Sequence, residues 1–109
     1  MKTLLICTAI IIGQMNTLQT KQVAYLAPHG NKIQTEFGGK LLELTNAPAI
    51  VYLPTIAPKL DSQGQPWSID IENLGPGVTT VLGQAQFSAR IRVGQTVHVA
   101  WNGTAYSLR

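Results

Sequence analysis

Glycine and proline occur so often along this chain that long helices have little room to form. The 109 residues include ten glycines and six prolines. Outside parts of the N-terminal third, no stretch of about twelve residues keeps helical spacing without one of them. Both residue types disfavour helix interiors and are common in turns. The chain is therefore expected to fold as short strands joined by turns.

The C-terminal half alternates apolar and polar residues, which is the pattern of strands with one buried face. Trp67, Ile69 and Ile71 alternate with polar neighbours, and the same period of two recurs in residues 86–93 and 96–101. Shorter apolar runs between turn signals predict the other strands. Together the strands are expected at residues 22–26, 33–37, 40–45, 49–53, 67–72, 78–82, 86–93, 96–101 and 104–108.

Short strands at regular spacing predict an all-β fold, and the chain is long enough for one domain. We expect an antiparallel β-sandwich, jelly-roll-like in topology, formed by residues 36–109. Residues 1–35 are expected to supply an extended N-terminal strand or arm. Asn102-Gly103 predicts a type I′ turn in the last hairpin, because such a turn needs positive φ at both central residues.

The N-terminal apolar run has two interpretations. Lys2 precedes residues 4–13, a run too short to span a bilayer but long enough for the core of a signal peptide. Residues 14–20 contain no cleavage site of the Ala-x-Ala kind, and the run is rich in β-branched residues. A buried or intersubunit strand is therefore the preferred interpretation. The candidate contacts with neighbouring chains in this run are Leu5, Ile6, Ile10, Ile11 and Ile12.

Charge argues against nucleic acid as a partner. Only 12% of the residues are charged, and the net charge is +3. Nucleic-acid-binding proteins concentrate positive charge on one face. Only Arg90 and Arg92 approach such a cluster, and they are expected either to contact a neighbouring chain or to be solvated. The lone Cys7 excludes an internal disulfide and a cysteine-based zinc site.

No pattern in the sequence predicts an enzyme. His29 lies in a turn, His98 lies on an outward strand face, and no Gly-x-Ser-x-Gly motif presents a nucleophile. Asp70 and Glu72 share a strand face, as solvent-facing residues of an alternating strand would. We therefore predict no catalytic residues, no metal ligands and no cofactor.

Four aromatic residues are candidates for packing. Trp67 and Trp101 are in phase with apolar strand neighbours, which favours a place in the core or between subunits over a sugar-binding platform. Tyr106 is a third candidate for that platform but is expected to pack like the tryptophans, and so is Phe87, which alternates with polar residues in the strand expected at residues 86–93.

Five segments occur in an order that resembles a β-rich module of tailed-phage virion proteins. This module is found in capsid decoration (cement) proteins and in tail-fibre or tail-spike segments. The resemblance covers about two thirds of the chain and leaves out residues 1 to about 35. The segments are Gly39-Lys40-Leu41-Leu42-Glu43-Leu44-Thr45, Ile50-Val51-Tyr52-Leu53-Pro54, Trp67-Ser68-Ile69-Asp70-Ile71-Glu72-Asn73-Leu74-Gly75, Val93-Gly94-Gln95-Thr96-Val97 and Trp101-Asn102-Gly103-Thr104-Ala105-Tyr106.

The resemblance implies a structural role in a virion. The expected function is that of a decoration protein on the capsid surface, without an enzymatic site. Its implied partners are the major capsid protein and copies of itself, as a homotrimer, with neither nucleic acid nor a membrane involved. One alternative is a small tail or fibre component. Another is a secreted β-sandwich binding module, which requires residues 1–20 to be a signal peptide.

Overall fold

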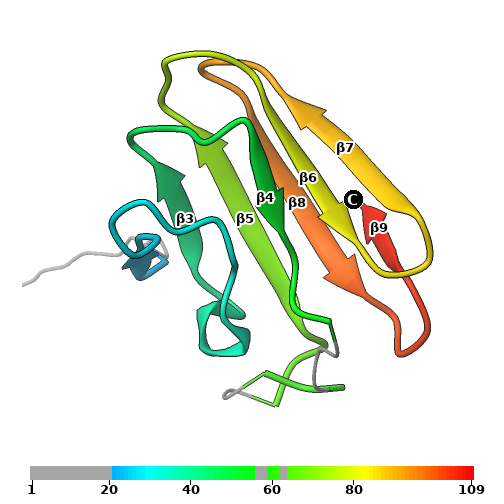
Figure 1. Cartoon of the computed structure of the whole chain (residues 1–109). Coiled ribbons are helices and arrows are strands. Elements are labelled where there is room, and N and C mark those ends of the chain that lie inside the picture. The colour runs from blue at the N-terminus through cyan, green and yellow to red at the C-terminus, as the bar shows by residue number, and fades with distance from the viewer. Residues whose placement is uncertain (1–20, 56–58, 62–63) are drawn as a thin grey trace, which may run out of the picture.

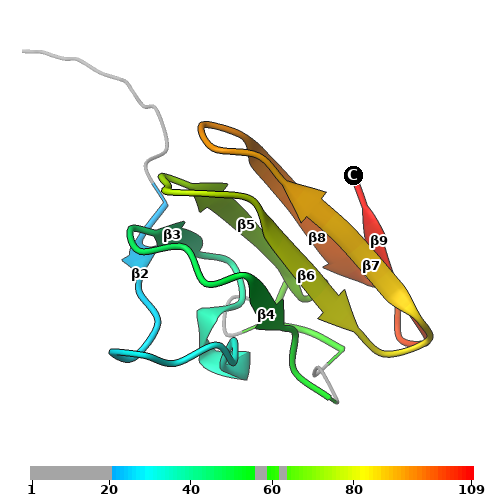
Figure 2. The same cartoon turned by 45° about the horizontal axis from the view of Figure 1, so that its top comes forward.

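The computed structural model describes residues 21–55, 59–61 and 64–109, which form two packed β-sheets. Figures 1 and 2 show the sheets as two layers of one sandwich. The all-β sandwich expected from the sequence is therefore confirmed. The five-stranded sheet has the order β2 (Val23–Ala24), β3 (Leu41–Leu44), β5 (Ser68–Asn73), β8 (Thr96–Trp101) and β9 (Tyr106–Leu108). The three-stranded sheet has the order β4 (Ile50–Tyr52), β6 (Thr79–Gly83) and β7 (Phe87–Ile91).

The sheets are mixed, whereas the sequence suggested purely antiparallel ones. β3 pairs with β5 in parallel, β4 pairs with β6 in parallel, and β2 pairs with β3 in parallel. From β3 to β6, the chain reverses direction at each connection and also crosses to the other sheet (Figure 1). Strands two apart in sequence therefore become parallel neighbours. Antiparallel pairing joins β5 to β8, β6 to β7 and β8 to β9.

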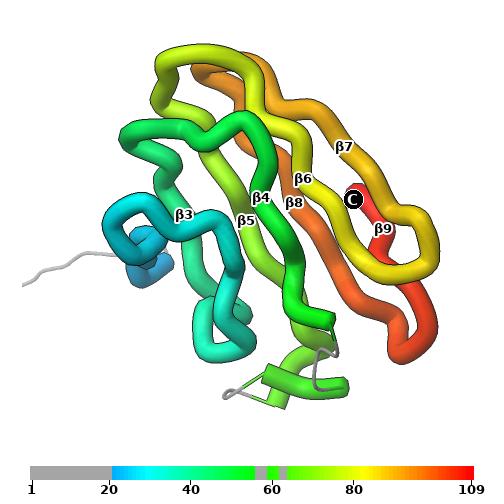
Figure 3. The backbone as a smooth tube through the Cα atoms, in the orientation of Figure 1, coloured from blue at the N-terminus to red at the C-terminus, as the bar shows by residue number. Residues whose placement is uncertain are grey.

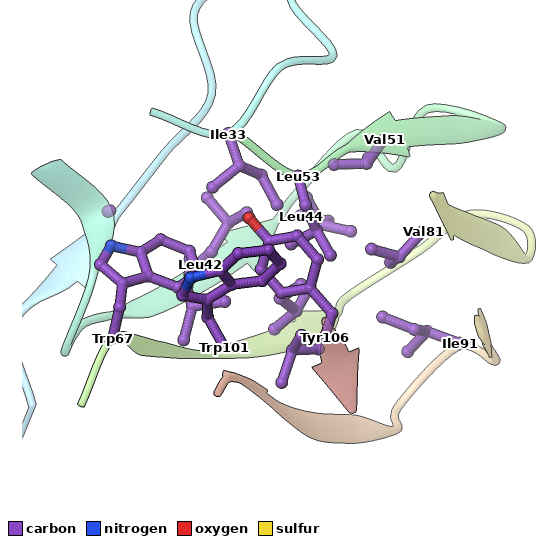
Figure 4. Close-up of a cluster of buried hydrophobic side chains, with 14 residues drawn as sticks. Ile33, Leu42, Leu44, Val51, Leu53, Trp67, Val81, Ile91, Trp101 and Tyr106 are labelled. Carbon is purple, nitrogen blue, oxygen red and sulfur yellow. The ribbon is translucent and has the colours of Figure 1, made fainter. Parts of the chain in front are cut away.

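Alternation along the strands builds the core between the two sheets. Ile69 and Ile71 of β5 are fully buried, while Ser68, Asp70 and Glu72 are only partly buried. Figure 4 shows side chains from both sheets meeting in this layer. Apolar burial at roughly 25 cal/mol per Å2 is the main force that holds such a layer together. The core residues are Ala24, Ile33, Leu42, Leu44, Val51, Leu53, Trp67, Ile69, Ile71, Val81, Ile91, Val99, Trp101 and Tyr106.

The four predicted packing aromatics lie together around Tyr106. Its ring centroid is 6.1 Å from that of Trp67, 6.0 Å from that of Phe87 and 4.7 Å from that of Trp101. Trp67, Trp101 and Tyr106 are buried, and Phe87 is partly buried and packs against the core. Trp67 is 0% exposed, so its indole has no surface to offer a sugar ring.

The strand expected at residues 33–37 is wrong, because Thr35–Phe37 form a 3-10 turn, η1. In this turn the Thr35 carbonyl accepts a hydrogen bond of 2.9 Å from Nε1 of Trp67. Gly38, which follows, lies against the same indole. A Cβ atom on Gly38 would lie 2.6 Å from Cδ1 of Trp67. The local backbone is therefore shaped by the need to seat and satisfy a buried tryptophan.

The last hairpin forms as expected between β8 and β9, but its turn is not of type I′. Gly103 has a φ of 97°, whereas Asn102 is absent from the positive-φ residues of the described chain. Oδ1 of Asn102 accepts hydrogen bonds of 2.8 Å from the backbone N–H groups of Thr104 and Ala105. The asparagine therefore closes a longer loop with its side chain, as asparagine commonly does in turns.

Residues before 36 contribute to the same sandwich. β2 pairs with β3, and the backbone N–H of Ile33 donates a 2.8 Å hydrogen bond to the Tyr52 carbonyl of β4. Figure 3 shows this N-terminal segment passing beside the strands. The candidate contacts Leu5, Ile6, Ile10, Ile11 and Ile12 lie outside the described residues, as does the part of the expected N-terminal arm before residue 21.

Candidate functional site

The loops β5–β6 and β7–β8 lie side by side at one end of the sandwich (Figures 1 and 3). Asn73, the last residue of β5, joins them through its backbone. Its N–H donates to the Gln95 carbonyl at 3.0 Å, and its carbonyl accepts from the Gly94 N–H at 2.6 Å. The two loops are therefore held as one rigid end.

The Asn73 side chain adds three further hydrogen bonds at this end. Nδ2 donates to the carbonyls of Gly77 at 2.8 Å and Ile91 at 2.9 Å, and Oδ1 accepts from the Gly75 N–H at 2.7 Å. Asn73 is 0% exposed, so these bonds satisfy an amide that burial would otherwise penalise. The sequence pattern did not single out Asn73, which lies between the strands expected at residues 67–72 and 78–82 and just before Leu74-Gly75-Pro76-Gly77.

A shallow groove of about 720 Å3 opens on this rigid end. Arg90 and Arg92 are both exposed there, and Val78 and Val93 are 41% and 56% exposed. We call these four residues the basic groove; Gly94 and Gln95 complete its lining. The carboxamide Oε1 of Gln95 accepts a hydrogen bond of 3.0 Å from the Arg92 N–H, which fixes the backbone beneath the second arginine. The structure thus brings the two predicted arginines together with two exposed valines that the sequence did not single out.

The outer face of the five-stranded sheet carries the opposite charge. Glu43 is the register partner of Glu72, and Asp70 lies on the same side of β5. We call these three residues the acidic face. The Tyr25 hydroxyl donates a 3.0 Å hydrogen bond to Oε1 of Glu43, and the carboxylate raises the pKa of the tyrosine.

Asp70 is the residue of the acidic face whose carboxylate contacts two other side chains, Lys21 and His98. Its Oδ2 is 2.6 Å from Nζ of Lys21, and its Oδ1 is hydrogen-bonded to Nδ1 of His98, its register partner on β8. Burial alone would raise the pKa of Asp70, but hydrogen bonds from Lys21 and His98 outweigh it and hold the pKa below 3.8. An ionised carboxylate only accepts hydrogen bonds, so Nδ1 of His98 carries the proton.

The Asp70–His98 pair could not be found by linear spacing, because its members are 28 residues apart and the strand register brings them together. In the described part of the chain, no hydroxyl or thiol side chain is hydrogen-bonded to His98. The hydrogen bond between Asp70 and His98 holds both side chains in place on the outer face of the five-stranded sheet. His29, the other histidine, is exposed in a turn with a φ of 61°.

Across residues 21–55, 59–61 and 64–109, no group of three or more His, Cys, Asp or Glu side chains is arranged to hold a metal ion. Within the same ranges there is no helix with the length and apolar character to cross a bilayer.

No protein-family model, curated protein or solved structure matches this chain.

Proposed function

We propose that the chain is a virion structural protein that decorates a phage capsid by binding the major capsid protein. The observation that carries this proposal is the open side of the sandwich. β7 ends the three-stranded sheet and β9 ends the five-stranded sheet, and no described strand pairs with the outer edge of either. Figure 1 shows both edges on the same side of the molecule. Unpaired edges present backbone donors and acceptors to which a partner can add a strand.

The arrangement of the resembling segments also supports the proposal. The first three contain β3, β4 and β5, and the last two lead into β8 and form the β8–β9 hairpin. These strands all belong to one sandwich, which β6 and β7, outside the five segments, complete. A decoration protein built on this sandwich stabilises a shell by burying strand edges and apolar surface, and the symmetry of the shell repeats each contact.

Purified virions from the source of the sequence test the proposal directly. A decoration protein is expected in the particle at a copy number comparable with that of the shell protein, and labelled antibodies should place it on the head. Labelling confined to the tail would replace the decoration role with that of a tail component. Absence from particles, together with a secreted chain starting near residue 20, would overturn the virion role.

Hydrogen exchange tests the docking mode. On binding to capsids, the backbone amides of β7 and β9 are expected to exchange more slowly. Those of β5 are expected to change little, because β5 already pairs with β3 and β8 and serves as an internal control. Equal exchange in the free and bound protein at β7 and β9 would exclude strand addition at these edges.

The N-terminal run is tested with a deletion of residues 2–13. If this run is an arm that binds a neighbouring subunit or the shell, the deletion should lower capsid occupancy. Unchanged occupancy would rule out an anchoring role. Mass spectrometry of the mature chain completes the test, because an intact Met1 or Lys2 terminus contradicts export.

A further inference from the structure

Charge is segregated on this molecule despite its low charge content. The acidic face holds three of the five acidic residues of the chain, Glu43, Asp70 and Glu72. Of these, Asp70 is already paired with Lys21 and His98. Glu43 accepts a hydrogen bond from the Tyr25 hydroxyl, which leaves its negative charge uncompensated. The acidic face therefore keeps an excess of negative charge.

The basic groove holds uncompensated charge of the opposite sign. Arg90 and Arg92 are exposed, and no acidic residue lines the groove. Within residues 21–55, 59–61 and 64–109, neither guanidinium forms an ion pair with a carboxylate. Val78 and Val93 add exposed apolar surface to the same groove. Cations next to apolar side chains form a surface suited to a partner that is both acidic and apolar.

The acidic face has exposed apolar side chains next to its carboxylates. Beside Glu43 it presents Tyr25 and Val23, which are 56% and 41% exposed. Val23 pairs in register with Leu41 of β3, which in turn pairs with Asp70, so an apolar strip borders the carboxylates.

The basic groove and the acidic face cannot meet within one molecule. Arg90 projects from the outer side of the three-stranded sheet, because its neighbours Ala89 and Ile91 are buried. Glu72 projects from the outer side of the five-stranded sheet, between the buried Ile71 and Asn73. The outer sides of a two-layer sandwich point in opposite directions (Figure 2).

We propose that the basic groove of one copy docks on the acidic face of a second copy of this chain. The contact is head-to-tail, since each copy uses two different surfaces, and such contacts close into rings or extend into filaments. The hydrogen bonds of Asn73 hold the backbone of the groove loops in place, so docking does not have to order that backbone. This inference deepens the proposed function and rests on it for the setting in which copies meet.

Charge reversal in the full-length protein tests the contact without capsids. Arg90→Glu/Arg92→Glu and Glu43→Lys/Glu72→Lys should each weaken self-association about tenfold or more in sedimentation or light scattering, because like charges then face each other. A one-to-one mixture of the two variants should associate again, since the reversed groove of one meets the reversed face of the other. The variant with all four reversals should also associate with itself.

Lys32→Glu/Lys59→Glu is the matched control. It changes the net charge as the arginine pair does, at exposed residues outside both surfaces, and should leave association unchanged. Each variant is first checked for native thermal stability. A wild-type chain that stays monomeric at all accessible concentrations would overturn the proposal, and so would arginine variants that associate like wild type. Capsid occupancy is measured separately, so failure of this contact does not imply failure of the decoration role.

Discussion

Nδ2 of Asn73, at the end of β5, donates a 2.9 Å hydrogen bond to the carbonyl of Ile91, at the end of β7 in the opposite sheet. This bond ties the two layers of the sandwich together at the end that carries the basic groove. Both residues are 0% exposed, so water cannot replace either partner. A single buried amide therefore links the packing of the core to the shape of a candidate binding surface.

Asn73→Ala is expected to lower the free energy of unfolding by about 2–4 kcal/mol, because it leaves buried backbone groups unsatisfied. Urea denaturation measures the change. Asn102→Ala is the matched control, since Asn102 is exposed and accepts two backbone hydrogen bonds in its turn. Its cost should be about 1 kcal/mol or less, because water can satisfy the exposed groups. Equal costs for the two variants would contradict the role assigned to Asn73.

The β6–β7 turn offers a stabilising substitution. Ala85 and Gln86 have φ angles of 59° and 62°, and the Phe87 N–H donates to the Gln84 carbonyl at 3.3 Å. Consecutive left-handed residues are strained unless they are Gly, Asn or Asp. Ala85→Asn/Gln86→Gly is expected to raise stability by about 1 kcal/mol, measured as a higher Tm. The chain already contains an Asn-Gly pair at Asn102-Gly103, but there only Gly103 has a positive φ. A lower Tm for the variant would show that the turn is not strained.

Deprotonation of the buried Tyr106 hydroxyl should lower the free energy of unfolding in alkaline solution. Its hydroxyl donates a 2.7 Å hydrogen bond to the Pro54 carbonyl, and burial raises its pKa to about 12. The folded state holds the phenolic proton more tightly than the unfolded state does. This contribution to stability is complete below pH 10 and is lost as pH rises toward 12.

Tyr106→Phe is expected to lower the free energy of unfolding by about 1–2 kcal/mol at neutral pH, because it leaves the Pro54 carbonyl without its donor. The variant should also lose less stability than wild type as the pH rises above 10. Urea denaturation across the alkaline range measures both effects. Tyr52→Phe, at an exposed position, serves as the control for removing one phenol. An alkaline fall of the same slope in Tyr106→Phe and wild type would contradict the assignment.

Asp70 should contribute to stability in the opposite pH range. Its pKa is held below 3.8, so the unfolded state takes up a proton before the folded state does. This contribution to stability is present above the pKa that Asp70 has in the unfolded chain, and it is lost as the pH falls through the lower pKa of the folded protein. Asp70→Asn is expected to cost about 0.5–1 kcal/mol at neutral pH, as partly exposed ion pairs do, and to make the acid fall shallower.

The control for Asp70 is Glu72→Gln, on the same strand and the same face. Thermal unfolding across the acid range compares the two variants. High salt should shrink the effect of Asp70→Asn, because Lys21 and Asp70 are both solvent-accessible, with side chains 41% and 21% exposed. An acid fall that is equally steep in Asp70→Asn and wild type would exclude this role of Asp70.

The strands of the C-terminal half were predictable because each carries its own signal. The period of two in residues 67–72 places Ile69 and Ile71 inside, where the structure has them. β8 has the same bounds that the pattern indicated, residues 96–101. Local alternation records which face of a strand is buried, and that information does not depend on the partner strand.

The pairing of strands could not be predicted in the same way. Nothing local in β3 specifies that its neighbour is β5, with β4 in the other sheet, so parallel pairs were missed. The acidic face and the Asp70–His98 pair depend on this register and were missed for the same reason. Thr35–Phe37 has strand-like residues, but packing around Trp67 bends it into a turn, so tertiary contact decides its conformation.

The crossing of the chain between layers has a consequence for folding kinetics. Among the described strands, only β6–β7 and β8–β9 are antiparallel hairpins of consecutive strands, while β3–β5, β4–β6 and β5–β8 each enclose other strands in their connection. Closing such long loops is slow, because chain entropy is lost before contacts repay it. We expect the two C-terminal hairpins to form early and the N-terminal strands to add late. A ribosome-bound chain that ends before residue 91 would therefore hold little stable structure, and the sandwich can close only once β8 and β9 have been synthesised.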